Sequence, residues 1–364
     1  MYIRMYKDGV PLWDEKKLST GGTNGTWSNQ KPDVGIADNG NAVVVWTADP
    51  DGNKYGDIAV RKVSPSGTVT SLPRPHASGD GDQLRPTVAV NGSGSYTVAW
   101  EDTADGSTLN QVLASSWDAA GALRYQDVKV STINAGAAGS NRRPDAAMDS
   151  SGNTAIVWEE DADGNGGINI GLAKLNTTGG FAVARRAANS LTDGQQSKPA
   201  VAQAADGRIV IAWGDEYIPG TGAGTPARPE RIYHRVFSAT GVPTETEART
   251  ISEKGSAAEP VDPDRPVGAQ SEPDVAVSGD GTFVVAWRES YASGTLQLSR
   301  RPAAFFRASP EPEPATRPAP AWSGMPGGSP GQAVPERAVV CGMRIDGADS
   351  ARSGSQRLHR PRER

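Results

Sequence analysis

In five places of this 364-residue sequence, a proline precedes a position that could carry acid–base chemistry. That position is Asp33, Asp145 or Asp274 in three places, and Thr87 or Ala200 in the other two. Two carboxylates that face one space can act as the acid and the base or nucleophile of a glycoside hydrolase, and their separation decides the stereochemical course. The sequence therefore indicates Asp33, Asp145 and Asp274 as candidate catalytic residues.

A second interpretation of the same acids needs no catalysis. The residue before the proline is basic in four of the five places: Lys31, Arg85, Arg143 and Lys198. Ion pairing with these residues along a rim would account for the carboxylates as surface electrostatics. Further acids follow the hydrophobic segments downstream, among them Asp57, Glu101, Asp102, Glu159 and Asp215, and predict that one face of the molecule is negative.

Two of the acidic stretches have the composition of a calcium loop. Asp161, Asp163 and Asn165 match the start of an Asp-x-Asp-x-Asn-Gly pattern, and Asp49, Asp51 and Asn53 match it more loosely. Calcium prefers several carboxylate and carbonyl oxygens on a flexible, glycine-containing backbone. These six residues are candidate metal ligands. The alternative is that they form polar hairpin turns in solvent.

The prolines belong to a repeat that dominates the sequence. A glycine follows each proline by eight residues and a tryptophan follows it by fourteen, without variation. Such a repeat is typical of an array of equivalent structural units. The five sets are Pro32/Gly40/Trp46, Pro86/Gly94/Trp100, Pro144/Gly152/Trp158, Pro199/Gly207/Trp213 and Pro273/Gly281/Trp287.

Each unit contains the pattern of four short antiparallel strands. An alternating stretch follows the proline, a dipeptide ending in glycine predicts a tight hairpin, and a β-branched run such as 43–46 predicts a buried second strand. A third strand, as in 58–63, and a weaker fourth complete the unit. Units of this kind predict an all-β fold, a β-propeller of about five four-stranded blades or an arc of a larger propeller. Each tryptophan is expected to pack between neighbouring blades.

The repeat also sets the domain boundaries. Residues 1–300 are expected to form the propeller, with a partial blade at 1–31 and blades starting near residues 32, 86, 144, 199 and 273. The fifth unit reaches a third strand near 296–298 before the pattern stops. Residues 301–364 are rich in proline and arginine without apolar periodicity, so we expect a disordered tail. The broken pattern at both ends leaves open that the chain is a truncated or frameshifted, non-functional fragment.

Composition argues against several classes of function. The net charge is −5, the acidic body lacks the clustered positive charge of a nucleic-acid-binding protein, and no apolar run approaches the length of a membrane span. The opening residues show no signal peptide, and the single Cys341 cannot form an internal disulfide. His76 and His234 lack a nucleophile-elbow sequence nearby, and packing is the expected role of both. No cofactor is required by any motif, except calcium if the loops bind it.

The blade pattern Pro-Asp-Val-Ala-x5-Gly-x5-Trp in the fifth unit resembles repeats of bacterial propeller proteins that are secreted or held at the cell surface. It is also similar in architecture to sialidase-like propellers, although the spacing of Gly40 and Trp46 does not match their Asp-box. The resemblance implies an extracellular or cell-surface location. We expect a monomeric, non-catalytic binding or scaffold propeller that recognises a glycan or an extracellular protein. The alternative is a glycoside hydrolase or sialidase-like enzyme that uses the carboxylates after the prolines.

Overall fold

The computed structural model confirms an all-β propeller fold built from antiparallel sheets. It describes residues 1–19, 29–50, 52–53, 55–103, 109–132, 139–161, 164, 166–190, 192, 194–216, 231–244, 249–250, 269–290 and 304–307. These all belong to a unit of residues 1–311, and residues 312–364 form a separate unit in which no residue is described. Within the described part, no helix is long and apolar enough to cross a membrane.

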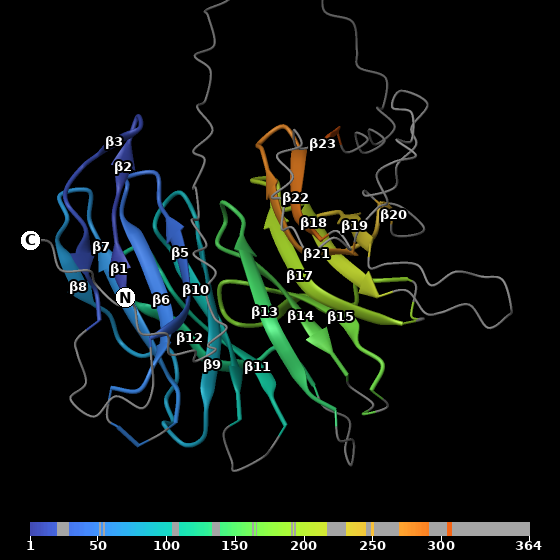
Figure 1. Cartoon of the computed structure of the whole chain (residues 1–364), viewed down its shortest axis with the longest axis horizontal. Helices are drawn as coiled ribbons and strands as arrows, with labels where there is room; N and C mark the ends of the chain where they lie inside the picture. The colour runs from blue at the N-terminus through green and yellow to red at the C-terminus, as the bar shows by residue number, and fades with distance from the viewer. Residues whose placement is uncertain are drawn as a thin grey trace, which may run out of the picture. The chain divides into compact units, whose positions relative to one another are not determined.

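Five sheets follow one another along the chain and are called blades 1 to 5 (Figure 1). Blades 1 to 4 each have four strands in sequence order, and blade 5 has three described strands. Blade 1 contains β5 (Gln30–Ile36), β6 (Ala42–Ala48), β7 (Asp57–Val63) and β8 (Val69–Ser71). Blade 2 contains β9 (Gln83–Val90), β10 (Tyr96–Asp102), β11 (Gln111–Trp117) and β12 (Leu123–Lys129). Blade 3 contains β13 (Asn141–Met148), β14 (Thr154–Glu160), β15 (Asn169–Leu175) and β16 (Phe181–Ala187).

The last two blades continue the same order. Blade 4 contains β17 (Gln195–Gln203), β18 (Ile209–Glu216), β19 (Arg231–Phe237) and β20 (Arg249–Thr250). Blade 5 contains β21 (Ala269–Val277), β22 (Thr282–Ser290) and β23 (Ala304–Arg307). The third strand thus lies beyond residue 300, where we expected the repeat to have ended, and the expected strand at 296–298 lies outside the described residues.

The N-terminal segment forms small ladders that pack beside blade 1. The strand β1 (Tyr2–Ile3) pairs with β4 (Lys16–Lys17), and β2 (Tyr6–Lys7) forms a hairpin with β3 (Val10–Pro11). Leu18 of this segment is buried in one cluster with Trp46 of blade 1. The segment therefore covers the face of blade 1 that is turned away from blade 2, where a preceding blade would pack.

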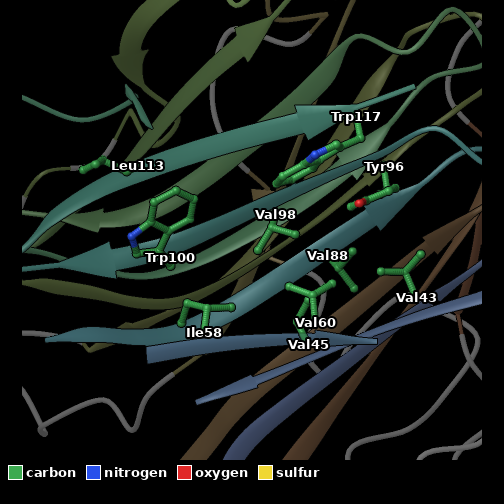
Figure 2. Close-up of a cluster of buried hydrophobic side chains, with 10 residues drawn as sticks. All are labelled: Val43, Val45, Ile58, Val60, Val88, Tyr96, Val98, Trp100, Leu113 and Trp117. Carbon is green, nitrogen blue, oxygen red and sulfur yellow. The ribbon is translucent and has the colours of Figure 1, made fainter. Parts of the chain in front are cut away.

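The repeated glycine and tryptophan have the same roles in every blade. Each hairpin glycine has a positive φ, from 79° at Gly40 to 96° at Gly94, and its N–H closes the turn between the first two strands. Each tryptophan packs against the sheet before its own, as Trp100 does against Val45, Ile58 and Val60 of blade 1 (Figure 2). The interblade packing predicted for the indoles is thus confirmed in blades 2 to 5.

The first strand of each blade is the one that meets its neighbours. β5 packs against β9, β9 against β13, β13 against β17, and β17 against β21. Each of these strands carries a bulge, a register shift at the residue pair before the candidate acid position. A proline has no N–H for the ladder, and a bulge accommodates it while turning nearby side chains out of the sheet.

Candidate functional site

The residues after the five prolines occupy one equivalent position in the blades. Asp33, Thr87, Asp145, Ala200 and Asp274 each pair with the residue just before the blade's tryptophan, for example Asp33 with Val45 and Asp145 with Val157. The first strands pack on one another in succession, so these positions come together. The four polar members, Asp33, Thr87, Asp145 and Asp274, are called the axial cluster.

Asp33 is held by both neighbouring strands. Its Oδ1 accepts the N–H of Val34 at 2.8 Å within its own strand. Its Oδ2 accepts the N–H of Val88 at 2.8 Å and the hydroxyl of Thr87 at 2.9 Å, both from blade 2. Three donors directed at one carboxyl stabilise its ionised form. Asp33 is therefore suited to carry a negative charge in the cluster.

Asp145 is the corresponding residue of blade 3, in a less favourable environment for charge. Its Oδ2 accepts the N–H of Val201 in blade 4 at 2.7 Å, and its Oδ1 lies 3.3 Å from the Thr87 hydroxyl. Burial raises the pKa of Asp145 to about 7, and the like charges of Asp33 and Asp274 raise it further than burial alone would. At neutral pH this carboxyl is thus poised between its protonated and ionised forms.

Thr87 connects the two carboxyls. Its Oγ1 lies within hydrogen-bond distance of both, and Thr87 itself is buried. A hydroxyl has one proton, so when Thr87 donates to Asp33 its oxygen can accept a hydrogen bond from a protonated Asp145. The hydrogen bonds among Asp33, Thr87 and Asp145 can all form when Asp33 is ionised and Asp145 is protonated. These are the two forms that a nucleophile or base and a general acid require.

Asp274 is the most open of the three carboxyls. Its Oδ1 accepts the N–H of Val275 at 2.9 Å. Its pKa is raised, chiefly because neighbouring protein displaces water around it and also because Asp33 is negative. Blades 1, 3 and 5 therefore bring their carboxylates into one electrostatic group, as the sequence predicted, while blade 4 contributes only the methyl group of Ala200.

Several of the acids expected on one negative face are buried instead. Asp57, Glu101, Asp102, Glu159 and Asp215 are all buried. Glu101 accepts hydrogen bonds from Arg85 Nη1 at 3.0 and 3.1 Å, from Asn110 Nδ2 and from the Arg143 N–H. Ion pairing does occur, but it joins the basic residues to these glutamates and not to the axial cluster. The acids were assigned to loops because the sequence does not show how far the second strands extend.

The residues before the prolines adopt an unusual backbone conformation in every blade. Lys31, Arg85, Arg143, Lys198 and Glu272 have positive φ, from 46° to 55°. For residues other than glycine this region costs of the order of 1–3 kcal/mol and tends to occur at functional sites. Neighbouring blades hold it in place: the N–H of Arg85 donates to Thr47 Oγ1 at 3.1 Å, that of Arg143 to Glu101 at 2.7 Å, and that of Lys198 to Glu159 at 2.8 Å.

A cavity of about 260 Å³ lies beside these bulges. Its lining consists of three basic residues and the prolines that follow them: Lys31, Pro32, Arg85, Pro86, Arg143 and Pro144. The next residues along the three strands are Asp33, Thr87 and Asp145. The cavity is called the mouth, because its lining residues directly precede three members of the axial cluster in their strands.

One repeated position was missed in the sequence. Three residues before each proline stands an amide side chain, and in blades 2 to 5 it is buried. The Asn141 Oδ1 accepts the Trp158 Nε1–H at 3.1 Å, and Asn29 does the same for Trp46 at 2.8 Å. The residues are Asn29, Gln83, Asn141, Gln196 and Gln270. Their fixed spacing from proline was a signal that could have identified a repeated buried amide. Acceptance of an indole N–H is seen for the two asparagines, whereas the Trp100 Nε1–H goes to Asp102 instead.

The three calcium candidates that the structure describes, Asp49, Asn53 and Asp161, are not brought together as a ligand set. Asp51, Asp163 and Asn165 lie outside the described residues. Asp49 Oδ1 accepts the Gly52 N–H at 2.7 Å, and Asn53 Oδ1 accepts the Tyr55 N–H at 2.7 Å, which are turn contacts. Among the residues described, no group of three or more His, Cys, Asp or Glu side chains is placed to hold a metal ion. Calcium binding at Asp161 and its neighbours stays a prediction.

Both histidines of the propeller are packed. His76 is buried, with its Nδ1 2.7 Å from the Ser78 carbonyl and its ring beside Trp100. His234 is buried in β19 with its ring 5.5 Å from that of Phe283. Each stabilises a contact between blades.

Comparison with known proteins identifies the fold but no sequence family. No protein-family profile and no curated protein sequence matches the chain. Among solved structures, the chain is similar to an α-L-arabinanase of Penicillium chrysogenum bound to arabinobiose, with 11% identity over 77% of this chain and 81% of that one and a TM-score of 0.50. It is also similar to an α-L-arabinofuranosidase of Fusarium graminearum bound to an iminosugar inhibitor, with 10% identity, 77% and 81% coverage and a TM-score of 0.51.

These similarities correct the function expected from the sequence. We expected a non-catalytic binding or scaffold propeller and doubted that the chain is an enzyme. The similar solved structures named above are an arabinanase and an arabinofuranosidase, so they speak against a non-catalytic propeller and for the glycoside hydrolase that was kept as the alternative. The absence of a catalytic set was inferred because Asp33 and Asp145 are separated by two units in the sequence, which hides their common contact with Thr87.

Proposed function

We propose that this protein is a glycoside hydrolase whose acid and nucleophile are Asp145 and Asp33. The observation that carries the proposal is the shared contact of both carboxyls with the Thr87 hydroxyl, at 3.3 and 2.9 Å, in a group where burial raises the pKa of Asp145 to about 7. A carboxyl that keeps its proton near neutral pH can donate it to the leaving glycosidic oxygen. A glycan substrate would also be consistent with the extracellular location implied by the repeats.

The geometry favours hydrolysis with retention of configuration. One oxygen of each carboxyl lies within hydrogen-bond distance of the same hydroxyl, at 2.9 and 3.3 Å, so the two carboxyls are close neighbours. Retaining enzymes hold their two carboxyls closer together than inverting enzymes, which leave room for a water molecule. Asp33 would therefore attack the anomeric carbon directly and form a glycosyl ester, while Asp145 protonates the departing oxygen. Asp145, now ionised, would then take a proton from the water that hydrolyses the ester.

The similar solved structures indicate which substrates to test first. The similar solved structures are an arabinanase and an arabinofuranosidase, so a substrate panel should include aryl arabinofuranosides and arabinan together with aryl hexosides and aryl uronosides. Asp145→Asn should lower kcat by about 10²- to 10⁴-fold on substrates with poor leaving groups. The loss should be much smaller on dinitrophenyl glycosides, which depart without a proton. Asp33→Asn should be inactive on both, because it removes the nucleophile.

Asp274→Asn is the matched control, since it removes a carboxyl at the equivalent position of blade 5 without the Thr87 contact. It should retain more activity than the other two variants. Circular dichroism would confirm that all three variants are folded. Turnover that survives both Asp33→Asn and Asp145→Asn would contradict the proposal.

A further inference from the structure

The mouth above the axial cluster combines apolar rings with cations. Pro32 is exposed at the mouth while Pro86 and Pro144 are buried beneath it, and Lys31, Arg85 and Arg143, called the mouth cations, stand beside these prolines. Binding sites for small molecules commonly pair an apolar lining with a few placed polar groups. The C–H face of a sugar ring can pack on such rings, while a charged substituent meets the cations.

The bulges direct the mouth cations toward this space. A residue in a regular strand would place its side chain between the blades, but a positive φ at Lys31, Arg85 and Arg143 turns it out of the ladder. The neighbouring blade supports this conformation by accepting the backbone N–H of Arg85 and of Arg143. The same strained geometry in three consecutive blades indicates that the position of these side chains is built into the fold.

The charge at the mouth is positive at its surface. Glu101 and Glu159, the partners of Arg85 and Arg143, have side chains only 1% and 7% exposed, whereas the arginine side chains are 41% and 44% exposed. Each arginine uses Nη1 for its glutamate and has further N–H donors. Lys31 is exposed and forms no ion pair with any residue in the described part of the chain.

The equivalent position of blade 5 carries an acid instead of a base. The residue before proline there is Glu272, which lies 3.8 Å from Lys198 Nζ and 3.7 Å from Arg288 Nη1. Glu272 is thus shared between a lysine of blade 4 and an arginine of blade 5. The three mouth cations lie in consecutive blades and line one cavity, so an anion would be bound on the side of blades 1 to 3.

From this arrangement we infer that the substrate is an acidic glycan, with a carboxylate or sulfate ester bound by Lys31, Arg85 and Arg143 while its ring rests on Pro32. The inference rests on the proposed function, because the same mouth leads to Asp33 and Asp145. Charge-assisted hydrogen bonds from guanidinium and ammonium groups are the strong interactions available for either anion. The neutral form of Asp145 would reduce repulsion of the incoming charge.

Binding to the Asp145→Asn protein separates recognition from catalysis. Isothermal titration would compare oligogalacturonate and dextran sulfate with their uncharged counterparts, oligogalactan and dextran, at two salt concentrations. At least one acidic probe should bind at least tenfold more tightly than its uncharged counterpart, with affinity falling as salt rises. Adding Lys31→Gln should weaken binding of that probe about three- to fivefold, as expected for one partly exposed charge.

Lys7→Gln is the matched control, because it removes the same charge from an exposed residue of the N-terminal hairpin. It should leave binding unchanged. Equal affinity for charged and uncharged probes, no binding of either acidic probe, or the same loss in both lysine variants would overturn the inference. Hydrolysis of neutral substrates alone would overturn the inferred acidic glycan and sustain the proposed glycoside hydrolase. Binding of an acidic probe by a wild-type protein that cleaves no substrate would sustain the recognition of acidic glycans and overturn the proposed function. Preference for one acidic probe would distinguish a carboxylate site from a sulfate site.

Discussion

Two repeated positions of the propeller differ in how much their residues vary from blade to blade. At the tryptophan position all five blades have the same residue, and it packs against the preceding sheet in blades 2 to 5. At the position after the proline the residues are Asp, Thr, Asp, Ala and Asp, although the backbone register is the same in every blade. Packing between sheets requires one shape repeated, whereas acid–base chemistry requires neighbours that differ in charge and proton affinity. The repeat therefore identifies the fold, and its departures from regularity identify the site.

The largest expected effect tests the constant position. Trp158→Ala should lower the free energy of unfolding by about 3–5 kcal/mol, because it opens a cavity among Ala99, Val112 and Ala114 of blade 2 and leaves Asn141 without its indole partner. Urea unfolding at neutral pH would measure it. Tyr55→Ala removes an aromatic ring that is 50% exposed, and it should change the free energy by less than about 0.5 kcal/mol. A cost below 1 kcal/mol for Trp158→Ala would contradict the packing role.

The contrast between the two positions also explains what could be predicted from the sequence. Strand number, hairpin glycines and interblade indoles follow from fixed spacing, since local turn chemistry and burial depend on nearby residues. Asp33, Asp145 and Asp274 were identified by their place after proline. The burial of Glu101 and Glu159 could not be predicted, because it depends on an arginine of the same blade and on a backbone N–H from the next blade. Neither the Thr87 bridge nor the cavity could be predicted, since both require the geometry of three blades.

A smaller effect, of opposite sign, is expected at the varied position. The folded-state pKa of Asp145 is raised from 3.8 to about 7, so between these values the folded protein binds more protons than the unfolded chain. Stability from this group is complete at low pH and is lost as pH rises toward 7. Asp145→Asn removes the titration and retains an acceptor for the Val201 N–H. At pH 8 the variant should be about 1–2 kcal/mol more stable than the wild type, although catalytically impaired.

The comparison that checks this is urea unfolding of both proteins at pH 5 and pH 8. The difference between them should grow from pH 5 to pH 8, and Asp206→Asn, an exposed aspartate in a hairpin, should show no such growth. A variant that is less stable than the wild type at both pH values would show that Asp145 serves the fold and not the chemistry.

The smallest effect concerns the two blades that lack an aspartate. Thr87 directs a hydroxyl at Asp33 and Asp145, while Ala200, its equivalent in blade 4, lies in the strand whose Val201 N–H already reaches Asp145. Ala200→Ser should supply a second donor to Asp145, stabilise its ionised form and lower its pKa. Activity requires protonated Asp145, so the pKa of the alkaline limb in the pH–rate profile should fall by about half a unit. Half a unit corresponds to about 0.7 kcal/mol, because one pKa unit corresponds to about 1.4 kcal/mol. An alkaline limb that stays in place or moves up in Ala200→Ser would mean that the limb reports a group other than Asp145.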